Sequence, residues 1–312
     1  MAQILYLRRL RDYGEKISDS LLFIKTNWKN LFLLYVIFVV PFIIVAGIVG
    51  VLFASHLYTS ILGSAEPLQF TDIFNVEFAV IILCLLMSGA SYQASVYSYM
   101  RLYEEKKGQQ PTISEVGQVF GKKFVKLFFY NIGVSIIVGF CIVIPSMLFA
   151  IAPVFALFII MISFMLLIMV FLHVNCIYAI EDVGFGGGIV RLFDLLRNRW
   201  LHSIGFTFII GLIYYVFGFM VQFLFSLLGI FSINFLNPES LGGAQSKAAF
   251  TSMVLGFGLV LLINQLFYLI VFSGIGINYY SLVEEKDGSA IEEQIDAIGT
   301  NNDKYGGIEE QY

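Results

Sequence analysis

The chain has 312 residues, of which 59% are hydrophobic and 13% are charged, with a mean hydropathy of +0.86 and a net charge of −4. Soluble domains are about 45–50% apolar and about 25% charged, so a water-soluble fold of this length could not bury so much apolar surface. No basic segment is dense enough to indicate a nucleic-acid partner. The composition predicts an all-α integral membrane protein.

The cysteines and the N-terminus add little to this class prediction. The spacing of Cys84, Cys141 and Cys176, each inside an apolar run, fits neither a disulfide framework nor a zinc site. We interpret them as small buried hydrophobic side chains. Residues 1–15 contain neither a long apolar stretch nor a small-residue cleavage motif, so no signal peptide is expected.

Six segments are apolar over the roughly 20 residues needed to cross about 30 Å of hydrocarbon. They cover about residues 31–54, 78–102, 125–150, 153–180, 203–231 and 250–282. The third and fourth are joined by a very short turn at Pro153, a residue suited to the first turn of a helix. An alternative for 127–175 is a re-entrant segment. We predict six transmembrane helices in one membrane domain, residues 1–288.

The distribution of Lys and Arg predicts the orientation. Of the 18 basic residues, all except Lys247 lie before the first span, between the second and third, between the fourth and fifth, or after the sixth. Such an excess marks the cytoplasmic side. We therefore expect a multi-pass inner-membrane protein with both termini in the cytoplasm and with loops 55–77 and 232–249 outside.

An internal repeat organises the predicted spans into units at about 13–108, 111–184 and 186–288. In each unit an aromatic residue (Trp28, Phe124 or Trp200) leads into a span and follows apolar residues at matching offsets. An acidic pair near a glycine closes each unit, for example Glu104 and Glu105 before Gly108. The alternative is that inner-membrane proteins generally place aromatic and charged residues at interfaces.

The repeat predicts three helical hairpins, each preceded by an amphipathic helix in the cytoplasmic interface. The three aromatic residues would be interfacial anchors, and Lys and Arg would reach toward anionic head groups. Thr112 with Glu115, and Ser289 with Glu292, have the spacing of capping boxes. The second box predicts a short amphipathic helix within 289–312, followed by a disordered cytoplasmic tail.

One segment resembles a known family. Glu181-Asp182 is followed by Gly184, an amphipathic stretch over 188–196, and Arg199-Trp200. This order resembles the membrane domain associated with glycerophosphodiester phosphodiesterases and the YciC-like six-span inner-membrane proteins, and the likeness extends over most of residues 1–290. The resemblance implies six spans and a function that is mostly unknown in the family. It brings no catalytic residues.

Polar residues within the spans are the candidate site residues, because buried ionisable groups in membranes are usually functional. His173 is the one titratable side chain near the middle of a span. It is either a proton or head-group site or, as we favour, a neutral histidine bonded to a neighbouring helix through Asn175 or a backbone carbonyl. The other polar candidates line a cavity or, as we favour, pack helices together; they are Ser91, Gln93, Asn264 and Gln265.

The acidic pairs raise two alternatives. Their carboxylates could ring a metal ion, since hard cations prefer oxygen ligands. We favour the second alternative, in which each pair offsets the N-terminal dipole of the following helix or binds nearby Lys and Arg.

The function expected from these patterns is non-enzymatic. No nucleophile elbow, P-loop, HExxH or CxxC motif is present, so no catalytic residue, metal or cofactor is predicted. We expect a scaffold or accessory protein that engages membrane lipids or partner proteins through its cytoplasmic interfacial helices. The alternatives are a permease or transporter component for a lipid or apolar solute and, less favoured, a membrane-embedded enzyme acting on a lipid.

Overall fold

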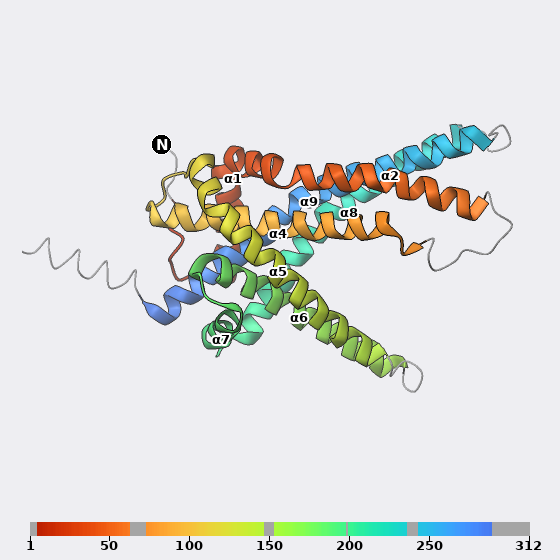
Figure 1. The fold of residues 1–312 in the computed structure, drawn as a ribbon. Helices are drawn as coiled ribbons and strands as arrows, with labels where there is room; N and C mark the ends of the chain where they lie inside the picture. The colour runs from red at the N-terminus through yellow and green to blue at the C-terminus, as the bar shows by residue number, and fades with distance from the viewer. Residues whose placement is uncertain (1–4, 63–72, 147–152, 198, 236–242, 289–312) are drawn as a thin grey trace, which may run out of the picture.

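The computed structural model describes residues 5–62, 73–146, 153–197, 199–235 and 243–288, and every regular element within these ranges is a helix. The predicted C-terminal helix and tail at 289–312 lie outside the described residues. The helices, in chain order, are α1 (Tyr13–Phe38), α2 (Val40–Leu62), α4 (Val76–Glu105), α5 (Ile113–Ser146), α6 (Pro153–Glu181), α7 (Phe185–Leu196), α8 (Trp200–Phe235) and α9 (Gly243–Asp287) (Figure 1).

The protein is a multi-pass helical membrane protein. Six segments of the described helices are long and apolar enough to cross a bilayer: Tyr13–Phe38, Val40–Leu57, Val76–Glu105, Leu157–Glu181, Trp200–Leu227 and Gly258–Asp287. Five of the six predicted spans overlap these segments. The described part of the remaining one, 125–150, belongs to α5, which is not among the six segments. The side chains at 138, 141, 142 and 144–146 lie outside the described residues, and the fully described part of α5 contains Lys122, Lys123 and Lys126. The span at 125–150 therefore stays a prediction.

The first predicted span, 31–54, is interrupted. α1 ends at Phe38, and α2 starts at Val40. Pro41 explains the break, because proline has no N–H to donate and its ring clashes with the carbonyl one turn earlier. The N–H of Phe42 accordingly bonds the carbonyl of Val39 at 3.1 Å, and the carbonyl of Phe38 accepts a hydrogen bond from the hydroxyl of Ser91 in α4. A serine from a neighbouring helix thus satisfies the backbone group that the kink releases.

The predicted interfacial helices form a separate element in only one of three places. The stretches before the first and third predicted spans are the opening turns of α1 and α5, so their prediction as separate helices is wrong. Capping boxes start both helices, at Asp12 with Glu15 in α1 and at Thr112 with Glu115 in α5. In α1 no helix-breaking residue follows until the kink at Pro41. The third stretch is the separate helix α7, which ends at Leu196 before α8 begins.

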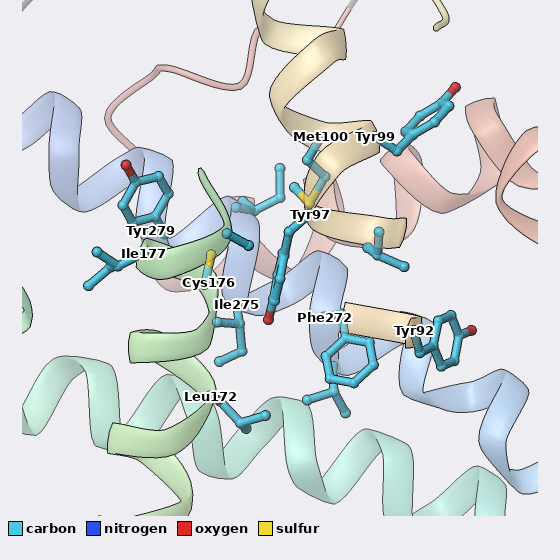
Figure 2. Packing of buried hydrophobic residues seen from close by; sticks show 14 of the residues in the cluster. Tyr92, Tyr97, Tyr99, Met100, Leu172, Cys176, Ile177, Phe272, Ile275 and Tyr279 are labelled. Atoms are coloured by element: carbon cyan, nitrogen blue, oxygen red, sulfur yellow. The ribbon is translucent and has the colours of Figure 1, made fainter. Parts of the chain in front are cut away.

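The helices pack as hairpins around α4 and α9. α2 packs on α4, α5 on α6, and α8 on α9, while α1 contacts both α4 and α9. All residues from 90 to 100 in α4 and from 269 to 284 in α9 are buried. Figure 2 shows Tyr97 of α4 beside Cys176 of α6 and Phe272 and Ile275 of α9, and the rings of Tyr97 and Phe272 lie 5.9 Å apart.

The helices converge at one end of the bundle, at the left of Figure 1. The start of α1, the ends of α4, α6 and α9, and α7 meet there, joined by ion pairs described below. We call this the charged end. Away from it, the α5–α6 hairpin diverges from the other two (Figure 1). The side chains of α6 near Phe155 and of α8 near Tyr215 are exposed, as suits contact with lipid.

Residues in the left-handed conformation follow α4, α6 and α9: φ is 53° at Lys107 and 89° at Gly108 after α4, 61° at Asp182 after α6, and 62° at Gly288 after α9. Glycine adopts this conformation without the steric cost that a Cβ brings, which explains two of the three recurring glycines. The third, Gly184, has a φ of −76° and is instead the N-cap of α7. Asp182 takes the left-handed position in its place, and short polar residues tolerate it.

The contact of α9 with α8 predicts that alanine substitutions at two glycines of α9 change the free energy of unfolding differently. A Cβ at Gly274 would lie 2.9 Å from Cδ1 of Ile210, whereas one at Gly256 would meet nothing within 4 Å. We expect Gly274→Ala to lower the free energy of unfolding by about 1–3 kcal/mol through overpacking. Gly256→Ala should leave it unchanged or raise it slightly. Thermal unfolding in one detergent measures both, and equal melting temperatures would contradict the predicted contact.

Candidate functional site

Three amide side chains from three helices meet inside the bundle. The Asn175 Nδ2 group of α6 donates to Oε1 of Gln93 in α4 at 2.8 Å and to Oδ1 of Asn131 in α5 at 2.9 Å. Nδ2 of Asn131 donates to the same oxygen of Gln93 at 3.4 Å. All three are at most 4% exposed. We call them the amide cluster; they hold α4, α5 and α6 in register, because an unpaired polar group in hydrocarbon is costly.

A second buried chain of polar groups links α1, α9 and α6. Nζ of Lys16 donates to Oδ1 of Asn278 at 2.9 Å, and Nδ2 of Asn278 lies 2.9 Å from Nε2 of His173. Nδ1 of His173 lies 2.9 Å from the carbonyl oxygen of Met169, one turn earlier in α6. Lys16 is 2% exposed, so the structure places its charge inside the bundle rather than at lipid head groups.

The charge of Lys16 fixes the direction of this chain. An ammonium can only donate, so the amide oxygen of Asn278 faces it and the amide nitrogen faces the histidine. Nε2 of His173 must then accept, and the ring proton must lie on Nδ1, which donates to Met169. His173 is therefore a neutral acceptor. Its partners are Asn278 and a backbone carbonyl, while Asn175, the other expected partner, belongs to the amide cluster.

The remaining polar candidates also lie at helix contacts. Ser91 bonds the carbonyl of Phe38 at the α1–α2 kink. Nε2 of Gln265 in α9 donates to the hydroxyl of Ser88 in α4 at 3.2 Å. Oδ1 of Asn264 lies against Gly218 of α8, where a Cβ would be only 2.8 Å away. These side chains join neighbouring helices, in the manner of polar contacts between membrane helices.

The three aromatic residues aligned by the repeat occupy different environments. Trp28 is 55% exposed on the outer face of α1. Phe124 stacks on Phe42, with centroids 5.9 Å apart, and Trp200 contacts Phe193 of α7 at 5.1 Å. The structure does not bring them together, so they are separate contacts rather than one site.

The acidic ends of α4, α6 and α9 bind basic side chains. Asp182 pairs with Lys123 of α5 and Arg101 of α4. Arg191 of α7 lies 3.1 Å from Glu181 and 3.0 Å from Asp287. Further pairs at this end are Arg8–Glu104 at 3.7 Å, Arg199–Glu285 and Lys286–Asp194. These carboxylates bind cations of neighbouring helices, and the described residues contain no group of His, Cys, Asp and Glu side chains that could hold a metal ion.

The ion pairs shift acidic pKa values at the charged end. Burial would raise the pKa of Asp182, but hydrogen bonds to Lys123 and Arg101 outweigh it and hold this pKa below its ordinary value. The hydrogen bonds from Lys106 and from the backbone of Thr112 lower the pKa of Glu115 to about 2. These carboxylates therefore stay ionised at neutral pH, and Glu115 continues to cap α5.

Two cavities are formed by other residues. One, of about 230 Å³, lies between α5 and α6 and is lined by Val134, Ser135, Phe164, Leu167, Ile168 and Phe171. The second, of about 270 Å³, lies at the charged end and is lined by Arg101, Leu102, Glu105, Gln118, Val119, Lys122, Lys123, Lys126 and Asp182. We call the second the basic cavity. Neither is lined by the polar candidates predicted from the sequence.

Sequence reasoning missed the inward direction of Lys16 and the role of Lys123. A signal for Lys16 was present, because it shares a helical face with Ser20, Phe23 and Asn27, all buried. The spacing showed this face but not that it turns inward. For Lys123, which is 3% exposed, no local pattern distinguished it from the neighbouring exposed lysines.

Comparisons with family models, with curated proteins and with solved structures find no match to this chain. The likeness to the membrane domain associated with glycerophosphodiester phosphodiesterases therefore stays a prediction.

The polar chain predicts unequal losses of stability for substitutions at Asn278, its middle member, and at Lys16, one of its ends. Asn278→Leu leaves a buried ammonium and a ring nitrogen without partners, so we expect it to lower the free energy of unfolding by about 2–3 kcal/mol. Lys16→Met removes the buried charge itself and should change that free energy by no more than about 1 kcal/mol. Thermal melting of both variants in the same detergent tests the order, and a larger loss for Lys16→Met would show that the chain is wrongly assigned.

The ion pairs of Asp182 predict that the stability of the fold depends on pH. Asn tolerates the left-handed conformation, so Asp182→Asn removes the charge without changing the backbone. We expect it to cost about 1–2 kcal/mol at neutral pH, since water still reaches half of the carboxylate. The native pKa is lowered, so the stability from this ion pair is present above the ordinary value of about 4 and is lost as the pH falls through the native pKa.

Melting temperatures measured from pH 7 downward test this dependence. The difference between the native chain and Asp182→Asn should be full at neutral pH and should close below about pH 4. A difference that is constant with pH would rule out the carboxylate charge as its cause.

Proposed function

We propose that this protein is a non-enzymatic scaffold or accessory protein of the inner membrane that engages lipids or partner proteins through its charged end. The observation that carries the proposal is the bonding of the polar interior. The side chains of the amide cluster and of the Lys16–Asn278–His173 chain make hydrogen bonds between helices, and Oδ1 of Asn175 is the one buried polar atom of these groups that has no partner. Groups committed to each other in this way stabilise one arrangement of the helices.

The same bonding argues against solute passage along the predicted polar path. A transport route through Ser91, Gln93, Asn264 and Gln265 would need them to face a shared space. Instead each contacts a neighbouring helix separately. Ser91 bonds a backbone carbonyl and Gln93 two amide side chains, while Asn264 lies against a glycine and Gln265 bonds a serine. His173 is engaged with an amide and a carbonyl, which gives it no acid or base partner for chemistry on a lipid.

The charge distribution supports an orientation with the charged end in the cytoplasm. Of the 18 Lys and Arg residues, 17 fall in segments that the sequence assigns to this side. Among the described residues, the Lys and Arg side chains that form ion pairs with Asp or Glu gather at the charged end. By the positive-inside tendency this end, which includes α7, faces the cytoplasm.

The threefold repeat is part of this proposal. Its support is the pairing of α2 with α4, α5 with α6 and α8 with α9, together with the left-handed residues that end α4, α6 and α9. The acidic end of α6 joins the units, because Asp182 pairs with Arg101 of the first unit and Glu181 with Arg191 of the third. The acidic ends of α4 and α9 pair with basic side chains at or just before their own units. The ion pairs at the charged end would then fix the three hairpins to each other.

The test is purification of the full chain in mild detergent, with identification of co-purifying proteins and lipids, followed by reconstitution into liposomes. We expect a defined protein partner or a retained lipid, and no solute movement above that of empty liposomes. Arg191→Ala, which removes the pairs from α7 to Glu181 and Asp287, should weaken partner recovery if α7 is the docking element. Phe155→Ala, at an exposed position far from the charged end, is the control. Transport by the purified chain without partner or lipid would overturn the proposal.

A further inference from the structure

The basic cavity at the charged end has an excess of positive charge. Arg101, Lys122, Lys123 and Lys126 line it against two carboxylates, Glu105 and Asp182, which leaves four positive and two negative charges. Its volume of about 270 Å³ accommodates a small polar group such as a phosphate with its ester substituent. The cavity is formed by the end of α4, the first turns of α5 and the residue after α6.

The excess resides on two lysines. Both carboxylates are already engaged, because Arg101 bonds Glu105 at 2.8 Å and also Asp182, and Lys123 bonds Asp182. Lys122 and Lys126 are exposed and have no carboxylate within ion-pair distance among the described residues. Lys126 and Arg101 both act on Lys123 as repelling charges. An anion bound among these cations would relieve that repulsion.

The surface next to the cavity is suited to a lipid. Lys122, Val125, Lys126 and Phe129 follow one another at spacings of three, one and three, which places them on one face of α5. Val125 is 52% exposed and Phe129 is 66% exposed, so apolar surface continues directly from the two lysines. A head group at the lysines would therefore lie at the start of an apolar strip that an acyl chain can follow.

We propose that the basic cavity binds a phosphate ester anion, supplied by the head group of an anionic phospholipid of the adjoining leaflet. This inference rests on the lipid engagement in the proposed function and names its site and ligand class. Lysine suits phosphate as a mobile point charge, and Arg101 remains committed to its two carboxylates. A free phosphate ester shares the same chemistry, and the choice between the two sources depends on the apolar strip.

The experiment titrates the purified full chain, in uncharged detergent, with short-chain phosphatidylglycerol, short-chain phosphatidylcholine and inorganic phosphate, using native mass spectrometry to count bound molecules. We expect phosphatidylglycerol to bind more tightly than phosphatidylcholine. Competition by inorganic phosphate at concentrations comparable to those of phosphatidylglycerol would support the site with a soluble phosphate as its ligand. Weak competition would support the lipid.

Three variants test the location. Lys122→Gln with Lys126→Gln should weaken phosphatidylglycerol binding by about 30-fold, the factor for two lysines near an anionic group. Lys25→Gln with Lys29→Gln makes the same charge change on the exposed face of α1 and should leave binding nearly unchanged. Glu105→Gln raises the charge of the cavity and should tighten binding about fivefold.

Two outcomes overturn the proposal. One is an equal loss of affinity in both lysine pairs, which would indicate general attraction to a basic surface. The other is native affinity in the Lys122 and Lys126 variant when its melting temperature is also native. Failure of the scaffold function appears separately, as solute transport by the native chain, and does not depend on these affinities.

Discussion

The structure depends on the satisfaction of polar groups away from water. Between lipid-facing helices no solvent is available to bond an amide, a lysine or a released carbonyl, so each needs a protein partner. Here the partners come from other helices: Asn175 bonds α4 and α5, Asn278 joins α1 to α6, and Ser91 bonds the carbonyl that the Pro41 kink exposes. Because these bonds are mutual, displacing one helix would leave groups on its neighbours unpaired.

At the charged end the same requirement is met by charge rather than by neutral amides. The recurring acidic pairs close α4, α6 and α9, and cations of α4, α5, α7 and the segment before α8 reach them. Exposed ion pairs of this kind contribute little individually, so their value lies in fixing the orientation of the hairpins. Lys123 is the exception, since its buried charge depends on Asp182.

Together these layers separate a fixed interior from an adaptable surface. In the interior, the amide cluster and the Lys16–Asn278–His173 chain are hydrogen-bonded between helices. The basic cavity instead keeps two lysines without acidic partners among the described residues. Recognition of an anionic ligand at the charged end can therefore occur without disturbing the amide cluster, which also holds α4, α5 and α6 together. This separation supports the proposed scaffold role, in which the surface of the charged end binds lipids or partners.

The sequence by itself determined the class of fold, the location of five of the six segments able to span a membrane, and the start of α5 at its capping box. These follow from local properties, namely the length of apolar runs and the chemistry of helix starts. It did not show that Pro41 ends α1, since a proline in a membrane helix can either kink it or end it. It also did not show that the amphipathic stretches at the start of α1 and of α5 continue without a break into the apolar parts of the same helices.

Only the tertiary structure decided which polar groups meet. Periodicity places Lys16 and Asn27 on one helical face, but the direction of that face depends on how α1 packs against α4 and α9. Asn131 and Asn175 are 44 residues apart, and nothing local to either predicts the contact. The same holds for the basic cavity, whose charge excess arises because Asp182 turns toward Arg101 and Lys123 and leaves Lys122 and Lys126 unmatched.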